Sequence, residues 1–352
     1  MIYNMPEYWL MKKAEPIVPY LTFSAPSSFT LKVNDATKHW NGTLEYSTDT
    51  STWSTWDGTT TLSSATSGSD NVLYLRGTGN TVITGNNTNY KWVLTGSDIA
   101  CIGNIENLLD YATVVSGEHP TMASNCYHSM FRNCTSLTQA PALPATTLAE
   151  GCYNDMFDGC TNLTQAPALP ATTLTTYCYD SMFCNCTNLT QAPALPATTL
   201  ADYCYEYMFY NCTSLTQASA LPATTLADNC YYYMFYGCTA LTQSPALPAT
   251  TLANSCYNRM FRYCTSLTQV PALPATTLTD YCYEKMFAGC TSIKLSSSKT
   301  DEYTQEYRIP ITGTGTTATN ALTSMFTSTG GTFTRTPKIN TTYYLSNTNA
   351  VV

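Results

Sequence analysis

One dipeptide, Met-Phe, recurs at a constant interval of 26 residues and constrains this chain more than any other feature. The seven copies begin at Met130, Met156, Met182, Met208, Met234, Met260 and Met286. A fixed period of this kind indicates repeat units that stack and bury their apolar faces against their neighbours. One such unit cannot by itself offset the conformational entropy that is lost on folding. The period therefore predicts a solenoid in which all seven units share one core.

The unit itself predicts a short helix. Cys152, Tyr153, Met156, Phe157 and Cys160 occupy positions i, i+1, i+4, i+5 and i+8, which would share one face of a helix of about two turns. The expected N-caps are Ser124, Glu150, Thr176, Asp202, Asp228, Asn254 and Asp280, with Glu150 the exception in residue type. The expected left-handed residues at the helix ends are Asn133, Gly159, Asn185, Asn211, Gly237, Tyr263 and Gly289, of which Tyr263 should be strained or capped differently.

The segment LTQAPALP follows each predicted helix and is too short and too rich in proline for a second one. We expect it to be a brief strand, and stacked copies would form a narrow parallel sheet. Leu137, Leu143, Leu148 and their equivalents should point inward to meet the Met-Phe face. The predicted fold class is an α/β solenoid, leucine-rich-repeat-like, with seven 26-residue repeats.

The repeated unit CTSLTQAPALPATTLAEGCYNDMF, residues 134–157, resembles a known family. Its MFxxCTSL core is similar to that of the BspA-like leucine-rich repeats, although its period is longer than is common in that family. The resemblance covers about residues 122–295. It implies a bacterial surface adhesin that binds proteins of a host or of neighbouring cells.

The sequences before and after the repeats have different residue patterns. Short alternating runs separated by turn residues predict an antiparallel β-sandwich, in which most of Trp40, Trp53, Trp56 and Trp92 belong to the core. Met325 and Phe326 mark a degenerate repeat that stands 39 residues after Met286. The predicted divisions are a docking arm (1–15), a β-sandwich (16–96), a helical cap with its helix near 102–111 (97–121), the repeats (122–295) and a C-terminal cap (296–352).

The arm carries Tyr3, Tyr8, Trp9 and Leu10. One hypothesis is that these side chains dock onto another subunit, and the alternative is that the arm is disordered or folds back. The first residues do not have the pattern of a secretory signal, and no run approaches the roughly 20 apolar residues of a membrane span. We therefore expect no membrane insertion.

Composition argues against several functions. Charged residues make up only 11% of the chain and the net charge is −8, so a nucleic-acid partner is not expected. His39, His119 and His128 lie in no metal-binding motif, and Cys184 with Cys186 forms no CxxC pair. We expect no enzyme, no metal and no cofactor. The two periodic cysteine series should be buried, reduced thiols, because helix geometry holds successive cysteines too far apart for disulfides.

The repeats differ from one another mainly on the predicted helical side. The varying positions favoured as contacts are Tyr207, Tyr210, Tyr232, Tyr233, Tyr236, Arg259, Arg262 and Tyr263. Tyrosine and arginine are frequent contact residues, so these positions could form a recognition surface for a protein or a glycan. The alternative is drift on a solvated face. The uniform Thr138 and Gln139 rows could form a polar ligand platform or amide ladders, and we favour ladders.

Together these features favour a non-enzymatic structural or adhesion protein. The first hypothesis is a surface protein of a phage virion (a fibre, decoration or receptor-binding protein), which is where its neutral Thr-, Asn- and Tyr-rich composition is typical. The alternatives are a bacterial cell-surface BspA-like adhesin and, third, an intracellular scaffold. Expected partners are other virion subunits or a host-surface protein or glycan, and a homo-oligomer is expected.

Overall fold

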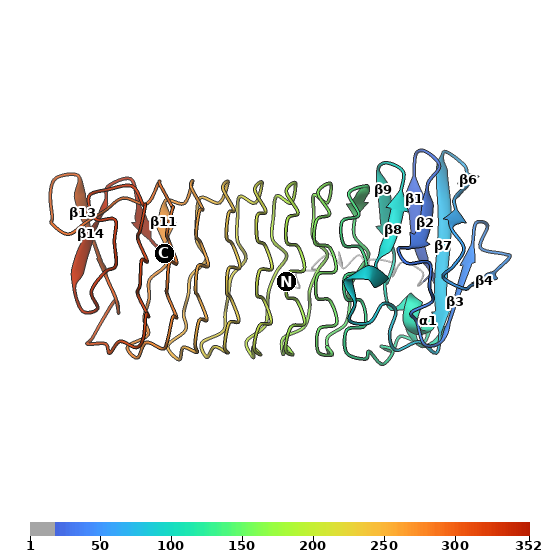
Figure 1. The fold of residues 1–352 in the computed structure, drawn as a ribbon, viewed down its shortest axis with the longest axis horizontal. Helices are drawn as coiled ribbons and strands as arrows, with labels where there is room; N and C mark the ends of the chain where they lie inside the picture. Colours follow the sequence, from blue (N-terminus) through green and yellow to red (C-terminus); the bar gives the residue numbers. More distant parts are fainter. Residues whose placement is uncertain (1–17) are drawn as a thin grey trace, which may run out of the picture.

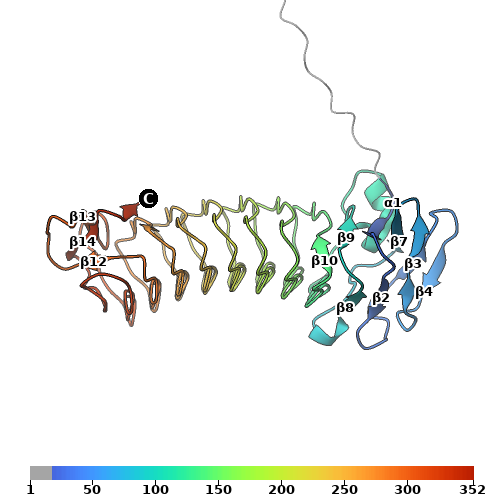
Figure 2. The same cartoon turned by 90° about the horizontal axis from the view of Figure 1, so that it is seen from above.

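The computed structural model describes residues 18–352, and the repeats form a row of stacked coils that begins against a β-rich N-terminal part (Figure 1). The predicted arm with Tyr3, Tyr8, Trp9 and Leu10 lies outside the described residues. Figure 2 shows the same row from above, with each coil in the same orientation as the next. The position of the repeats in the chain is thus also their position along the molecule.

Two antiparallel sheets form the N-terminal part. The larger contains β1 (Leu21–Ala25), β3 (Thr43–Ser47), β4 (Ser54–Trp56), β6 (Ala65–Ser67), β7 (Asp70–Thr78) and β9 (Ile99–Ile102). The smaller contains β2 (Thr30–Val33), β5 (Leu62–Ser63) and β8 (Trp92–Thr95), which the single-turn η1 (Thr88–Tyr90) precedes. Side chains of β1 alternate between fully and partly buried, as expected for a strand that covers a core on one face.

Tryptophans join the two sheets. Trp56 of β4 lies 5.0 Å from Trp40 and 5.4 Å from Trp92 of β8, and all three are buried. Trp53 is only partly buried and instead carries the Arg76 guanidinium 4.0 Å above its ring. Three of the four tryptophans therefore belong to the core, as predicted.

The first coil continues this core without a break. Trp92 lies 6.2 Å from Phe131, and the Trp92 amide donates to the Met130 carbonyl at 2.8 Å. β10 (Leu137–Gln139) pairs in parallel with β9 at the edge of the larger sheet. The helix expected near 102–111 is α1, which begins later, at Asn107–Val115, because Ile102 still belongs to β9, and it packs mainly against β7. The sheet edge is covered by the repeats, so it does not remain open for pairing with another chain.

The predicted helices of the repeats are wrong, and with them the α part of the predicted α/β class. Among the described residues the structure contains one α-helix, α1, and none lies in the repeats. Each predicted helix is a run of tight turns, which we call the turn ribbon. In the first repeat the amides of His128, Met130 and Arg132 each donate to the carbonyl three residues earlier. The amides between them donate to the next repeat, for example Tyr127 to Cys152 and Phe131 to Met156, both at 2.9 Å.

The spacing of the buried residues explains this outcome. A helix has 3.6 residues per turn, so side chains at i, i+4 and i+8 drift around its axis. In the turn ribbon a buried pair such as Cys204 and Tyr205 alternates with a half-buried pair, and the pattern returns after four residues at Met208 and Phe209. Every fourth residue has a left-handed backbone, with φ of 57° at Asn125, 55° at Ser129 and 61° at Asn133. The interval of four residues is therefore the repeat of successive tight turns and not that of an α-helix.

The expected helix caps have other roles. Asp202 and Asp228 accept hydrogen bonds from the amides of Asp228 and Asn254, each in the following repeat, at 3.0 and 2.8 Å. These side chains therefore join repeats and do not cap helices. All seven predicted left-handed positions do have positive φ, including Tyr263 at 65°. Its ring lies over Gly289 of the next repeat, where an added Cβ would be 2.3 Å from Tyr263 Cδ1.

The proline-rich side forms a minimal parallel sheet. Single-residue parallel bridges join Gln165, Gln191, Gln217, Gln243 and Gln269, and a second row joins threonines such as Thr173 and Thr199. Longer stretches occur at the two ends of the repeats, as β10 with Gln139 and as β11 (Gln269–Val270). The expected narrow parallel sheet is thus present with about one paired residue per repeat.

The core consists of identical columns. Seven tyrosines from Tyr127 to Tyr283 stack face to face with ring centroids 5.6–5.8 Å apart. The phenylalanines of the Met-Phe pairs form a second column at 5.5–5.8 Å, which ends on Phe326 of the degenerate repeat. Leu137, Leu143 and Leu148 are buried as predicted.

The cysteines fill this core as free thiols, and 15 of the 16 are buried, Cys184 being half-buried. From Cys160 onward the second series donates from sulfur to a phenylalanine carbonyl of the preceding repeat, for example Cys160 to Phe131 at 3.0 Å and Cys212 to Phe183 at 3.1 Å, while Cys134 donates to the Trp92 carbonyl. Burial raises the pKa of the Cys160 and Cys212 thiols well above the ordinary value, which keeps them protonated.

The C-terminal end covers the last repeat. The Phe287 amide donates to Met325 at 3.0 Å, so the degenerate repeat stacks in register despite its 39-residue spacing. The extra residues leave the row to form strands with the end of the chain. These strands are β12 (Leu295–Ser296), β13 (Tyr303–Arg308), β14 (Thr342–Ser346) and β15 (Ala350–Val351). β15 pairs in parallel with β11.

Candidate functional site

The structure brings all eight predicted contact residues together on one surface. They lie on the outer positions of the turn ribbon in the fourth, fifth and sixth repeats, where the buried Met-Phe pairs begin at Met208, Met234 and Met260. We call this set the tyrosine–arginine cluster. Its members are Tyr207, Tyr210, Tyr232, Tyr233, Tyr236, Arg259, Arg262 and Tyr263.

Stacked tyrosine pairs form the middle of the cluster. Tyr207 lies 4.9 Å from Tyr233, and Tyr210 lies 4.6 Å from Tyr236 with the two rings nearly parallel. Tyr232 packs edge-on against Tyr233 at 4.4 Å. Because equivalent positions of successive repeats lie directly one above the other, identical residues there must stack. The cluster is therefore a rigid consequence of the repeat geometry.

Two arginines close the cluster on its C-terminal side. The Arg259 guanidinium lies 5.3 Å from the Tyr233 ring, donates to the Tyr232 hydroxyl at 3.2 Å and contacts Glu284 at 3.4 Å. The Arg262 guanidinium lies 5.8 Å from the Tyr236 ring and 4.7 Å from the Tyr263 ring. Such cation–π contacts hold a guanidinium in place without neutralising its charge.

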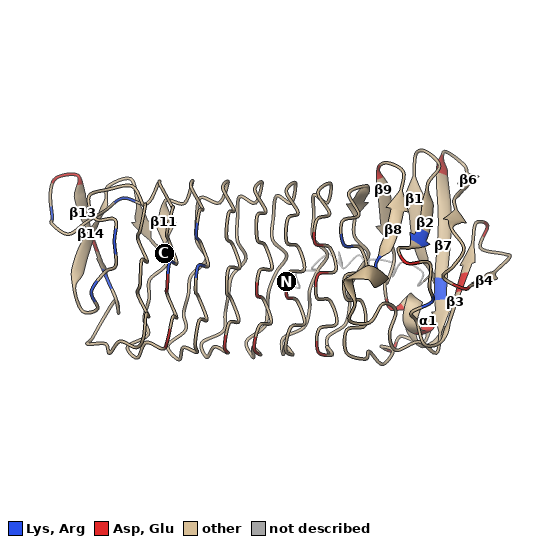
Figure 3. Ribbon diagram, in the orientation of Figure 1, with Lys and Arg blue, Asp and Glu red and all other residues tan. Residues whose placement is uncertain are grey.

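Carboxyl groups occupy equivalent outer positions in the second and third repeats and one position of the fourth. They are Asp155, Asp158, Asp180 and Glu206, which we call the acidic row. Figure 3 shows the acidic residues on coils nearer the N-terminal part and the basic residues of the cluster on later coils. From the second repeat to the sixth, the outer surface of the turn ribbon thus changes from acidic to aromatic to basic, while the first repeat carries Arg132 and the seventh Glu284.

Burial dominates the titration of three carboxyls in the acidic row. Desolvation raises the pKa of Asp155 to about 6, of Asp180 to about 7 and of Glu206 to about 8, and the Asp180 charge adds to the effect at Glu206. Asp180 accepts from the Asn154 amide at 3.2 Å. These carboxyls give up their protons near neutral pH.

The sequence did not single out two features of this surface. Tyr177 stacks on Tyr203 at 4.7 Å, one residue before the first cysteine of its repeat, and Tyr281 occupies the same position with 38% exposure. That position looked like part of a helix start and therefore gave no contact signal. The acidic row became recognisable only when the turn ribbon placed its members one above the other.

The opposite side of the repeats is more uniform. Threonine hydroxyls donate to the threonine carbonyl of the preceding repeat, as in Thr190 to Thr164 at 3.4 Å and Thr268 to Thr242 at 3.2 Å. In the part of the chain that the structure describes, the side chains of Gln165, Gln191 and their equivalents form no mutual hydrogen bond. The favoured amide ladder is therefore wrong, and a hydroxyl ladder takes its place.

The histidines lie apart from this surface. His39 stacks on Tyr90 at 3.5 Å, and His128 is buried, which lowers the pKa of its imidazole. His119 contacts the buried Glu106 carboxylate at 2.8 Å beside the start of α1. Within residues 18–352 no group of three metal-ligating side chains is close enough to hold an ion, and no helix is long and apolar enough to cross a membrane.

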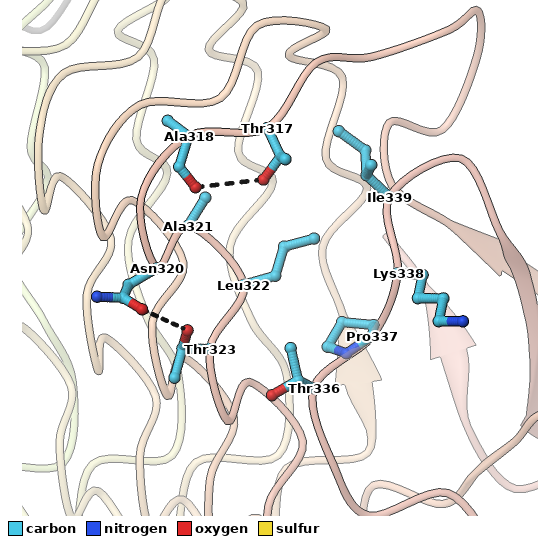
Figure 4. Close-up of a pocket in the computed structure, with 10 residues that line it drawn as sticks. All are labelled: Thr317, Ala318, Asn320, Ala321, Leu322, Thr323, Thr336, Pro337, Lys338 and Ile339. Carbon is cyan, nitrogen blue, oxygen red and sulfur yellow. Dashed lines mark hydrogen bonds between the residues drawn. The ribbon is translucent and has the colours of Figure 1, made fainter.

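A separate hollow lies in the C-terminal cap (Figure 4). Leu322 of the degenerate repeat points toward Pro337 and Ile339 of the following segment, with Thr336 and Lys338 at the rim. The Thr323 hydroxyl is bonded to Asn320 at 3.1 Å. The hollow brings together apolar side chains and one lysine, without a second charged group.

Comparison with known sequences identifies the repeats. The family model of the BspA type leucine-rich repeat region matches in six copies, over residues 113–242 and 179–307, which together span more than half of the chain. No curated protein and no solved structure matches. The chain therefore belongs to the family of proteins with BspA type leucine-rich repeats.

Proposed function

We propose that this chain is a non-enzymatic surface protein that uses its stacked repeats as a rigid solenoid to present the tyrosine–arginine cluster to a protein or glycan. The observation that carries the proposal is the convergence of eight variable residues on one continuous surface above an almost invariant core. Tyrosine and arginine supply large contact areas and directional hydrogen bonds at low entropic cost.

For the setting, we propose the surface of a phage virion, as a fibre, decoration or receptor-binding protein. The neutral composition, with 27 tyrosines and only 11% charged residues, supports this assignment. Other virion subunits and a host-surface protein or glycan would be the partners, and the chain would act as a homo-oligomer. The second candidate is a bacterial cell-surface adhesin, which the family match favours because BspA type repeats are consistent with a surface or adhesion protein.

Imaging separates the two settings. Gold-labelled antibodies raised against residues 18–95 are applied to purified phage particles and to intact cells from the native source. Label on capsids or tails supports the virion assignment, and label on cell envelopes supports the adhesin. Label confined to the cell interior would overturn both.

A binding assay tests the surface. The fluorescent whole chain is titrated against cells that bind it, alongside a variant with alanine at Tyr207, Tyr210, Tyr233 and Tyr236. We expect binding to fall by at least about tenfold, because the stacked rings would be lost. A matched variant with alanine at Tyr20, Tyr74, Tyr90 and Tyr344, outside the cluster, should bind normally. Equal binding by the cluster variant and the unmodified chain would contradict the assignment of this surface.

A further inference from the structure

Arg262 differs from the other cations on the turn ribbon. Arg132 contacts Asp158 at 2.8 Å, while Arg259 and Lys285 share Glu284 at 3.4 and 2.7 Å. Arg262 forms no ion pair with any of residues 18–352, and its buried Nε has no hydrogen-bond partner. Its Nη2 donates to the Tyr263 hydroxyl at 2.9 Å.

The surroundings of Arg262 keep this free charge in a fixed place. The rings of Tyr236 and Tyr263 lie 5.8 and 4.7 Å from its guanidinium carbon. A guanidinium held in this way can meet a carboxylate with two parallel hydrogen bonds and loses little further freedom on binding. The geometry therefore suits one anionic group at the sixth repeat.

Toward the N-terminal side, the surface next to Arg262 is uncharged and periodic. Tyr236 and Tyr210 stack at 4.6 Å in one row, and Tyr233 and Tyr207 stack at 4.9 Å in the neighbouring row. Each step along the surface thus presents the same ring edges and hydroxyls. Sugar rings of an extended oligosaccharide recur at a similar interval and have the same mixture of apolar C–H and hydroxyl groups. A short, regular, uncharged chain of sugars fits this row better than a peptide, whose side chains vary.

The outer positions on the N-terminal side of Arg262 limit how much negative charge a ligand can carry. Glu206 lies one repeat before Tyr232, and Asp180 and Asp158 follow in the two repeats before that. The turn ribbons of the second to fifth repeats carry no lysine or arginine, so a polyanion that extended from Arg262 along the tyrosines would place its further charges where no cation can pair with them. The charge pattern favours a ligand whose single acid lies at the Arg262 end.

We propose that the tyrosine–arginine cluster binds an oligosaccharide with one terminal acidic sugar, whose carboxylate pairs with Arg262 and whose neutral sugars lie along Tyr236 and Tyr210. The inference rests on the proposed function, since it names the class of ligand for the same surface. It excludes heparin-like chains, in which every few sugars carry a charge.

Calorimetric titration of the whole chain with matched trisaccharides tests the proposal. The set contains trisaccharides ended by a sialic, glucuronic or galacturonic acid, the methyl ester of each, the neutral analogue, a heparin hexasaccharide and the peptide acetyl-Ala-Ala-Asp-amide. We expect at least one acid-ended trisaccharide to bind and its methyl ester to bind about tenfold to a hundredfold more weakly. Binding should weaken as salt is raised.

Substitutions at Arg262 test where the carboxylate of the ligand binds. Arg262→Gln should lose the difference between acid and ester, and Arg262→Lys should keep part of it because a lysine cannot form the bidentate pair. Arg335→Gln is the control, since Arg335 also lies over an aromatic ring, Phe333 at 6.0 Å, but belongs to the C-terminal cap. Equal thermal unfolding of the three variants would show that the fold is intact.

Several outcomes would overturn the inference. These are no binding by any acid-ended trisaccharide, equal binding of acid and ester, tighter binding of heparin, equal binding of the peptide, or an unchanged preference in Arg262→Gln. Binding of the neutral sugar alone, lost in the four-tyrosine variant, would refute the acid while leaving the proposed function standing. Failure of the antibody and cell-binding experiments would instead refute the proposed function itself.

Discussion

The inner and outer sides of the turn ribbon consist of neighbouring residues in the same short segment, yet they obey different rules. Phe209 and its equivalents are the same in all seven repeats and fully buried, whereas the next residue is Tyr210 in one repeat and Asp158, Cys184 or Arg262 in others. The backbone bonds between repeats are the same beneath every one of these residues. The core columns therefore maintain the stack and leave the outer positions free to vary.

The largest expected effect comes from breaking a core column. Phe209→Ala removes a buried ring that stacks on Phe183 and Phe235, and should lower the free energy of unfolding by about 3–5 kcal/mol. Tyr210→Ala, one residue further along, removes a half-buried outer ring and should cost about 1 kcal/mol or less. Urea unfolding followed by circular dichroism measures both. Similar losses in the two variants would remove the distinction between inner and outer sides.

A second, smaller effect arises where an outer side chain constrains the neighbouring repeat. In Gly289→Ala the new Cβ would meet the Tyr263 ring at a backbone φ of 79°, which should cost about 1–3 kcal/mol. Adding Tyr263→Ala should recover part of that loss. Gly68→Ala, at φ of 63° with open space around it, provides a control for backbone strain alone. If the Tyr263→Ala background recovered nothing, the ring would not be the constraint.

The smallest expected effect concerns the acidic row. The folded-state pKa of Glu206 is raised to about 8 and that of Asp180 to about 7, above their values in an unfolded chain. The folded state therefore binds more protons at these two groups, so their contribution to stability should be greatest below about pH 4 and be lost as the pH rises toward 8. Glu206→Gln should flatten the upper part of this dependence in thermal unfolding. A stability that rises between pH 5 and pH 8 only in the unmodified chain would contradict the raised pKa.

The sequence predicted the large features because each rested on repetition or strand alternation. The 26-residue period placed Met130 to Met286 in one core, and alternating residues marked strands such as β1. The helix prediction failed because two core patterns share the positions i, i+4 and i+8, and only hydrogen bonding between repeats distinguishes them. No single unit contains that information, because every second amide of its turn ribbon donates to a carbonyl of the next unit.

The candidate site was likewise predictable from the sequence only in part. Variation between repeats was enough to identify Tyr207, Tyr233 and Arg262 as surface residues. Their stacking distances and the missing ion pair of Arg262 depend on the rise between coils, which a linear sequence does not state. Tyr177 and Asp180 escaped notice because an assumed helix would have placed them on different faces.

The alternating hydrogen bonds of the turn ribbon also bear on how such a chain can change over generations. The turn-ribbon amides of every internal unit donate to carbonyls of the next unit, and its own carbonyls accept the same bonds from the unit before. A whole 26-residue segment can therefore be duplicated or deleted without creating a new kind of junction. The distance from the N-terminal sheets to the C-terminal cap can then change in steps of one coil, independently of which side chains occupy the outer positions.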